Sequence, residues 1–285
     1  MSNDERLQLC DREFLFSYFV KSPVRFACQR IFSRFATPTI IPVHQTFAVD
    51  IFDRPEGGVM FPTGKVLHES SLWSLSETGE YHFLRITSPM EVVGALEAII
   101  SVRRSRIKVF VDTPWTGQES FSTAWNLLFR IVFHASLDAI SEQFVKGLGL
   151  LVDEHGVLIN TSRGELPRDV VATLAGRFPT LGHNRLLLRR ERDGFHLYAT
   201  PWTKPGFVNY NANIMLKLLV LIRPETDPET FSKKDFISHF VSRGGDAITG
   251  GVPSGQMLLS ELTTMEIAYT TSDKLIGELE SLSVN

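Results

Sequence analysis

The chain has 285 residues, of which 43% are hydrophobic and 21% are charged. These proportions are typical of globular proteins and exclude a chain that stays disordered for want of apolar residues. The 29 basic and 32 acidic side chains give a formal charge of -3, which excludes the strong overall positive field of a general nucleic-acid binder.

The sequence indicates an intracellular protein. Its two cysteines, Cys10 and Cys28, are too few for a secreted domain held together by disulfides. The N-terminus carries charges within its first six residues and has no cationic start that leads into an apolar run, so we see no signal peptide. The apolar run over residues 14–20 is far shorter than the roughly 20 residues that cross a bilayer. We therefore expect a cytoplasmic or nuclear chain without a membrane segment.

The N-terminal region predicts helices followed by strands. Residues 12–35 read as a helical arm of two short helices broken at Ser22-Pro23, with aromatic residues at helical spacing. From Thr39 the pattern changes to β-branched and aromatic residues between Pro and Gly, which predicts strands over 39–43, 47–52 and 81–87.

A strand-helix-strand unit is predicted over residues 81–112. Ser88-Pro89-Met90-Glu91 has the composition of a helix start, with a capping serine and a proline at the first helical position. Apolar residues continue this helix to about Val102, and 106–112 is a β-branched strand. Two strands joined through a helix are parallel if they lie in one sheet.

The middle of the chain predicts further helices and two antiparallel hairpins. A helix is expected over 119–145, and shorter ones over 165–177 and 211–222. The hairpins cover 148–160 and 185–200, and the second turns at Asp193-Gly194, a dipeptide that suits a tight hairpin turn. We therefore expect an α/β or α+β fold with a mixed sheet.

The composition changes near the C-terminal end. Residues 1–243 are interpreted as one globular domain, and the glycine-rich residues 244–255 as a linker or long loop. The last segment, 256–285, carries apolar residues at roughly helical spacing up to about Leu282. Such an amphipathic segment either docks on its own domain or binds a protein partner.

No complete catalytic or metal-binding motif is present in the sequence. The dipeptide Gly64-Lys65 lacks the other residues of a phosphate-binding loop, and the cysteines and histidines show no familiar zinc-ligand spacing. We therefore predict no cofactor and no metal. The sequence leaves open whether the chain is an enzyme, and it favours a non-catalytic binding or scaffold protein that uses residues 256–282.

An alternative comes from residues 106–159, where a strand, a helix and GLLVDEHGVLI are similar to the latter part of polymerase-β-type nucleotidyltransferases. The resemblance implies nucleotidyl or phosphoryl transfer, with Asp50, Asp53 and Asp112 as catalytic carboxylates that hold Mg²⁺. This sequence departs from the family, since no Gly-Ser helix start precedes Asp50 and Lys108 stands where an acidic residue is expected. An inactive relative is a further interpretation.

Two basic clusters in the sequence suggest a third hypothesis, which is that the chain binds RNA or single-stranded nucleic acid. Its candidate residues are Arg103, Arg104, Arg106, Lys108, Arg189 and Arg190. Arginines beside exposed aromatic rings can hold single strands. Glu191 and Asp193 interrupt the second cluster, which favours a solvated hairpin face.

Overall fold

The computed structural model describes residues 5–20, 41, 43–87, 94–112, 115, 119–137, 141–161, 166–202, 212–224, 263–269 and 272–281. These residues form two compact units: unit 1 runs up to Leu137, and unit 2 contains the described residues from Ser141 onward. Residues 1–243, interpreted above as one domain, include parts of both units. The predicted linker over 244–255 lies outside the described residues.

The described residues are mostly β, with 54% of them in strands and 19% in helices. Unit 1 contains β1 (Glu5–Leu9), β2 (Arg12–Phe19), β3 (Gln45–Asp53), β4 (Lys65–Glu69), β5 (Trp73–Thr78), β6 (Tyr81–Thr87), β7 (Ala95–Ser101), β8 (Arg106–Val111) and α2 (Glu119–Ala135). Unit 2 contains β9 (Glu142–Val145), β10 (Leu148–Val152), β11 (His155–Thr161), α3 (Arg168–Arg177), β12 (Thr180–His183), β13 (Leu186–Glu191), β14 (Gly194–Tyr198), β15 (Asn213–Pro224), β16 (Thr264–Tyr269) and α6 (Ser272–Ser281). None of the helices in the described part is long and apolar enough to cross a membrane.

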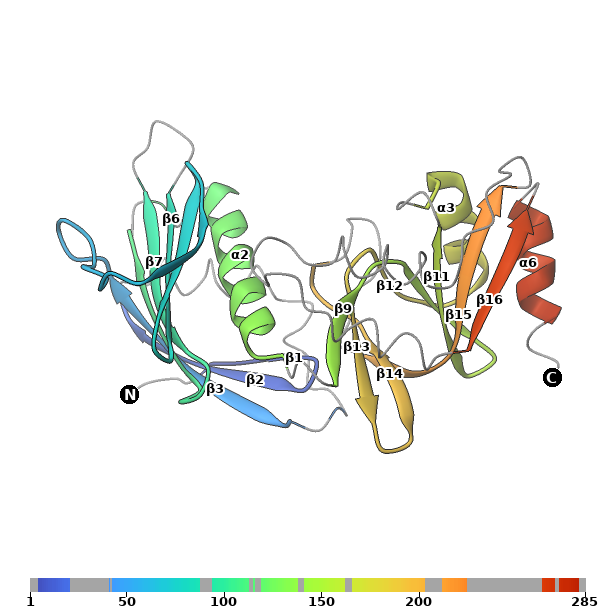
Figure 1. The fold of residues 1–285 in the computed structure, drawn as a ribbon, viewed down its shortest axis with the longest axis horizontal. Coiled ribbons are helices and arrows are strands. Elements are labelled where there is room, and N and C mark those ends of the chain that lie inside the picture. Colours follow the sequence, from blue (N-terminus) through green and yellow to red (C-terminus); the bar gives the residue numbers. More distant parts are fainter. Residues whose placement is uncertain are drawn as a thin grey trace. The chain divides into compact units, whose positions relative to one another are not determined.

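Unit 1 is a curled sheet that packs on one helix. The strand order is β1-β2-β3-β8-β7-β6-β5-β4, with β3 parallel to both β2 and β8 and the other pairs antiparallel. Figure 1 shows this sheet curving beside α2. The helix buries Trp125 and Phe129, and the Phe129 ring meets that of Phe14 edge to face at 5.1 Å. Aromatic packing between α2 and the sheet therefore forms the core of this unit.

The predicted helical arm over residues 12–35 is wrong in its first part. Arg12–Phe19 forms strand β2, and residues 21–40 lie outside the described residues. Phe14 and Phe16 are buried, whereas Phe19 is 59% exposed. Alternate residues of a strand face the core, so Phe14 and Phe16 fit a strand, and pairing with β3 and β1 overrides the helical interpretation.

The strand-helix-strand unit predicted over 81–112 is wrong in its middle element, although its two outer strands do lie in one sheet and run in the same direction. The two outer strands exist as β6 and β8, but Ala95–Ser101 is a strand between them, antiparallel to both. The proposed helix start at residues 88–91 lies outside the described residues. Six of the seven β7 residues are buried, and a short segment buried on both faces has no polar side to reveal its periodicity. The three strands form an antiparallel meander.

Unit 2 contains a second mixed sheet, in which β11, β15 and β16 run parallel. The strand order is β12-β10-β11-β15-β14-β13-β9, and β16 also pairs with β15. Helices α3 and α6 share one buried cluster with Val157 and Ile159, while the neighbouring Leu158 belongs to a separate cluster with Leu197. The two faces of the sheet therefore carry two cores.

Of the predictions for the middle of the chain, several are confirmed, one is wrong in part and one is wrong. The hairpins predicted over 148–160 and 185–200 exist as β10–β11 and β13–β14. Helix α3 occupies 168–177 of the predicted 165–177, but α2 ends at Ala135 rather than continuing to Val145. The predicted helix over 211–222 is wrong, because Asn213–Pro224 is the central strand β15.

The C-terminal segment belongs to the body of unit 2. Its described residues form β16, parallel to β15, and α6, and Ile267, Leu275 and Leu279 lie in the same buried cluster as α3. Arg177 of α3 donates to Glu280 of α6 at 2.6 Å. The described apolar residues of this segment thus dock on their own unit, one of the two alternatives that the sequence leaves open.

Leu275→Ala is expected to lower the free energy of unfolding of unit 2 by about 2–5 kcal/mol, because it opens a cavity in a closed cluster. Urea unfolding followed by circular dichroism measures the change. Glu278→Ala, on an exposed position of the same helix, is the control and should change stability by less than about 0.5 kcal/mol. Equal effects of both substitutions would contradict the docking of α6.

Candidate functional site

The three aspartates of the nucleotidyltransferase hypothesis are not gathered at one point. Asp50 and Asp53 lie three residues apart on β3, so they point to opposite faces of the sheet and are separated by about 10 Å along the strand. Asp50 is buried and accepts from Arg106 at 3.2 Å. Asp112 follows β8 and accepts from the backbone N–H of Ala95 at 2.7 Å.

A buried ion cluster lies beside Asp112, and sequence analysis did not identify it. The carboxylate of Glu97 on β7 is fully buried and accepts from the guanidinium groups of Arg54 and Arg85 at 3.0 and 2.7 Å. It also accepts from the backbone N–H of Val59 at 2.7 Å. Burial opposes ionisation of Glu97, but these donors together hold its pKa below the ordinary value.

The Glu97 cluster has a structural role. Its two arginines and the Val59 N–H attach the segment after β3 to the sheet. A Cβ atom on Gly58, whose φ is +81°, would lie 2.4 Å from the Arg54 guanidinium, so glycine is needed at this point. The arginines are committed to an internal carboxylate rather than offered to a ligand.

The two predicted basic clusters lie in different units, and three of their six residues are paired with acids. In unit 1, Arg106 bonds Asp50, and Arg104 lies 2.5 Å from Glu80. Arg103 and Lys108 are exposed. In unit 2, Arg189 lies 3.6 Å from Glu142 and Arg190 is exposed. Ion pairing therefore reduces the positive charge that either place offers to a phosphate backbone.

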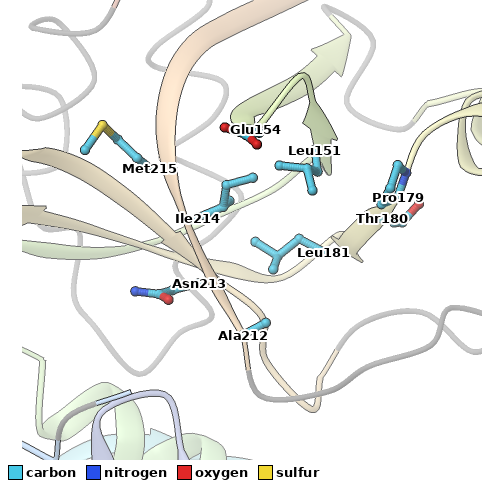
Figure 2. A pocket seen from close by; sticks show the side chains of 9 residues that line it. All are labelled: Leu151, Glu154, Pro179, Thr180, Leu181, Ala212, Asn213, Ile214 and Met215. Carbon is cyan, nitrogen blue, oxygen red and sulfur yellow. The ribbon is translucent and has the colours of Figure 1, made fainter. Parts of the chain in front are cut away.

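A groove in unit 2 is the candidate binding site. Figure 2 shows its lining, which comes from the β10–β11 turn, the start of β12 and the start of β15. Its volume is about 420 Å³, and its lining residues are Leu151, Glu154, Pro179, Thr180, Leu181, Ala212, Asn213, Ile214 and Met215. An adjoining depression of about 500 Å³ shares three of these residues and is completed by Val152, Asp153, Arg177, Phe178 and Glu280. The two form one surface with an apolar floor.

The groove carries a negative charge at one place. Asp153 and Glu154 form the two-residue turn between β10 and β11, and both are exposed. Their φ values are +43° and +67°, as in a hairpin turn of type I′. The two central residues of such a turn are most often Asn-Gly. Arg177 and Glu280 neutralise each other. The carboxylates of the turn therefore give this surface an excess of negative charge.

A hydrogen-bonded chain leads from the groove to the β13–β14 hairpin. The side chain of Asn213 hydrogen-bonds the Tyr198 hydroxyl, which donates to Glu191. Burial, followed by the hydrogen bond and charge of Glu191, raises the pKa of Tyr198 above its ordinary value. The phenol therefore stays protonated at neutral pH and keeps its bond to Glu191.

Sequence analysis did not find the groove, because its lining comes from segments that are far apart in the chain. Of these segments, only the hairpin over 148–160 was predicted from the sequence. Glu154 is the local signal of the groove, because it occupies a turn position that prefers glycine. Strained backbone of this kind tends to occur at functional sites.

Comparison with known proteins does not connect this chain to a family. No protein-family model matches the chain, and no curated protein matches its sequence.

Acid is expected to weaken unit 1 through Glu97. Because its pKa is lower in the folded chain than in the unfolded chain, the ionised form stabilises the fold above about pH 4.3, the unfolded value, and this contribution is lost as the pH falls through the folded pKa. Glu97→Gln should remove that pH dependence and lower the free energy of unfolding at pH 7 by about 3–5 kcal/mol. Urea unfolding between pH 3 and 7 measures both effects. Glu69→Gln on exposed β4 is the control.

Glu154→Gly is expected to raise the free energy of unfolding by about 1 kcal/mol, because glycine adopts the positive φ of this turn without the clash that other residues meet. In the Glu154→Gln variant, residue 154 still has a side chain and must adopt the same positive φ, so the free energy of unfolding should be unchanged. Thermal or urea unfolding of the two variants gives the comparison. A Gly variant no more stable than the Gln variant would argue against the described turn.

Proposed function

We propose that the chain is a non-catalytic binding protein whose groove in unit 2 takes a protein partner with an apolar and a basic side chain. The observation that carries the proposal is the apolar floor beside the turn carboxylates. Leu151, Leu181 and Ile214 supply the floor, and Asp153 and Glu154 supply the charge. A basic side chain matches that charge, and an apolar one gains free energy by leaving water.

The lining residues favour binding over catalysis. The residues around the two depressions include no histidine, cysteine or serine, so the described lining lacks the Ser–His and Cys–His pairs of nucleophilic catalysis. Glu154, Thr180 and Asn213 are the polar groups around the first depression. A few polar groups above an apolar surface are typical of sites that bind rather than react.

Under this proposal, the C-terminal segment forms one side of the binding surface. Glu280 of α6 lines the second depression, and Arg177 holds it in place. The role proposed for residues 256–282 changes accordingly, because their described part builds the binding surface instead of leaving the fold to reach a partner. No specific observation favours metal-dependent nucleotidyl transfer or nucleic-acid binding as a second function.

Selection of random peptides on the full-length chain tests the proposal. We expect the selected peptides to combine a lysine or arginine with a large apolar residue, and Glu154→Lys to lower their affinity at least tenfold through charge reversal. Fluorescence polarisation with a labelled peptide measures the affinity. Asp273→Lys, which reverses an exposed acid at the start of α6 away from the groove lining, should leave it unchanged. Peptides without basic residues, or equal effects of both variants, would count against the proposal.

A further inference from the structure

The β13–β14 hairpin gathers three side chains of the kinds that bind metals. Ligand atoms of Glu191, Asp193 and His196 all lie within 4.8 Å of one another. Across the described ranges of the chain, no other set of His, Cys, Asp or Glu side chains meets this criterion. We propose that these three residues bind one divalent transition-metal ion, with Zn²⁺ as the test ion.

The hairpin itself places the ligands. Arg189 pairs with His196 across the two strands, and Glu191 lies two residues beyond Arg189, so Glu191 and His196 are on the same face of the hairpin. Asp193 occupies the turn between them, followed by Gly194 with a φ of +141°. Because a short paired segment supplies all three side chains, little chain ordering is needed when an ion binds.

The burial of His196 also suits a metal ligand. Its side chain is only 13% exposed. The ring nitrogen Nε2 lies 3.1 Å from Asp193 Oδ1, so it is the nitrogen that an ion between the three residues would meet. A ring held in place by packing loses little rotamer freedom when an ion binds.

The charge and support of the site also suit a cation. Tyr198 donates to Glu191, which is the kind of outer hydrogen bond that orients a ligating carboxylate. The nearby cation Arg189 lies against Glu142 at 3.6 Å, so Glu142 balances it and the two carboxylates of the trio keep their negative charge. Asp193 is 58% exposed in its side chain, which leaves an open side for the ion and for water ligands.

The ligand set determines the class of metal. Two carboxylates and one imidazole suit transition metals such as Zn²⁺ or Mn²⁺, whereas Ca²⁺ and Mg²⁺ prefer sites made only of oxygen. Among these ions, nitrogen and oxygen sites bind Zn²⁺ more tightly than Mn²⁺. This inference is independent of the proposed function, although Tyr198 and Asn213 connect the trio to the groove.

Zn²⁺ binding to the full-length chain, after treatment with a chelator and dialysis, tests the inference. Isothermal titration calorimetry should give one equivalent of Zn²⁺, and Asp193→Asn and His196→Gln should each weaken binding at least tenfold. His155→Gln is the matched control, because residues 153–155 place two acids and a histidine at the other hairpin turn without meeting the same distance criterion. That variant should bind as the unchanged chain does.

A second readout does not depend on the variants folding. In the unchanged chain, nuclear magnetic resonance of the histidine rings should show a Zn²⁺-induced shift at His196 and none at His155. The inference is overturned if the chain binds no stoichiometric Zn²⁺, if the His196 ring does not respond, or if His155→Gln weakens binding as much as His196→Gln does.

Discussion

Unit 2 depends on the pairing of one strand, β15, with three others. Its twelve residues pair with β11 along one edge and with β14 and then β16 along the other. The approach to β11 is close, since a Cβ atom on Gly156 would lie 2.8 Å from the carbonyl oxygen of Met215. The start of β15 lines the groove, its neighbour β14 carries His196, and its far end holds the C-terminal elements in place.

Elements with exposed turns were predicted correctly from the sequence, whereas strands buried on both faces were not. The hairpins at 148–160 and 185–200 were predicted correctly because polar residues and glycine mark their turns. Segments buried largely on both faces were assigned to helices: β7 is apolar except for Glu97 and Ser101, and β15 has an apolar run over 218–222, because each side of the sheet is covered there. Leucine, alanine and isoleucine in such a run carry no information about which period they follow.

The candidate sites were less accessible to sequence analysis than the fold. The groove joins the β10–β11 turn to residues 179–181 and 212–215, and the Glu97 cluster joins Arg54 to Arg85. Such groupings depend on strand order and register, which no local pattern specifies. The metal-binding trio is the exception, because its three residues lie within one predicted hairpin. There, Glu191 and Asp193 were interpreted only as charges that interrupt a basic cluster.

The pairing of β15 with β16 has a consequence for synthesis of the protein. Between Pro224 and Thr264 the ribosome adds 39 further residues before the second edge of β15 can be filled. The cluster beneath α3 must wait until Leu275 and Leu279 have left the exit tunnel. The described elements of unit 1 are translated by Leu137, so that unit can fold early. Unit 2 stays incomplete for longer, and the second edge of β15 stays open until β16 has been made.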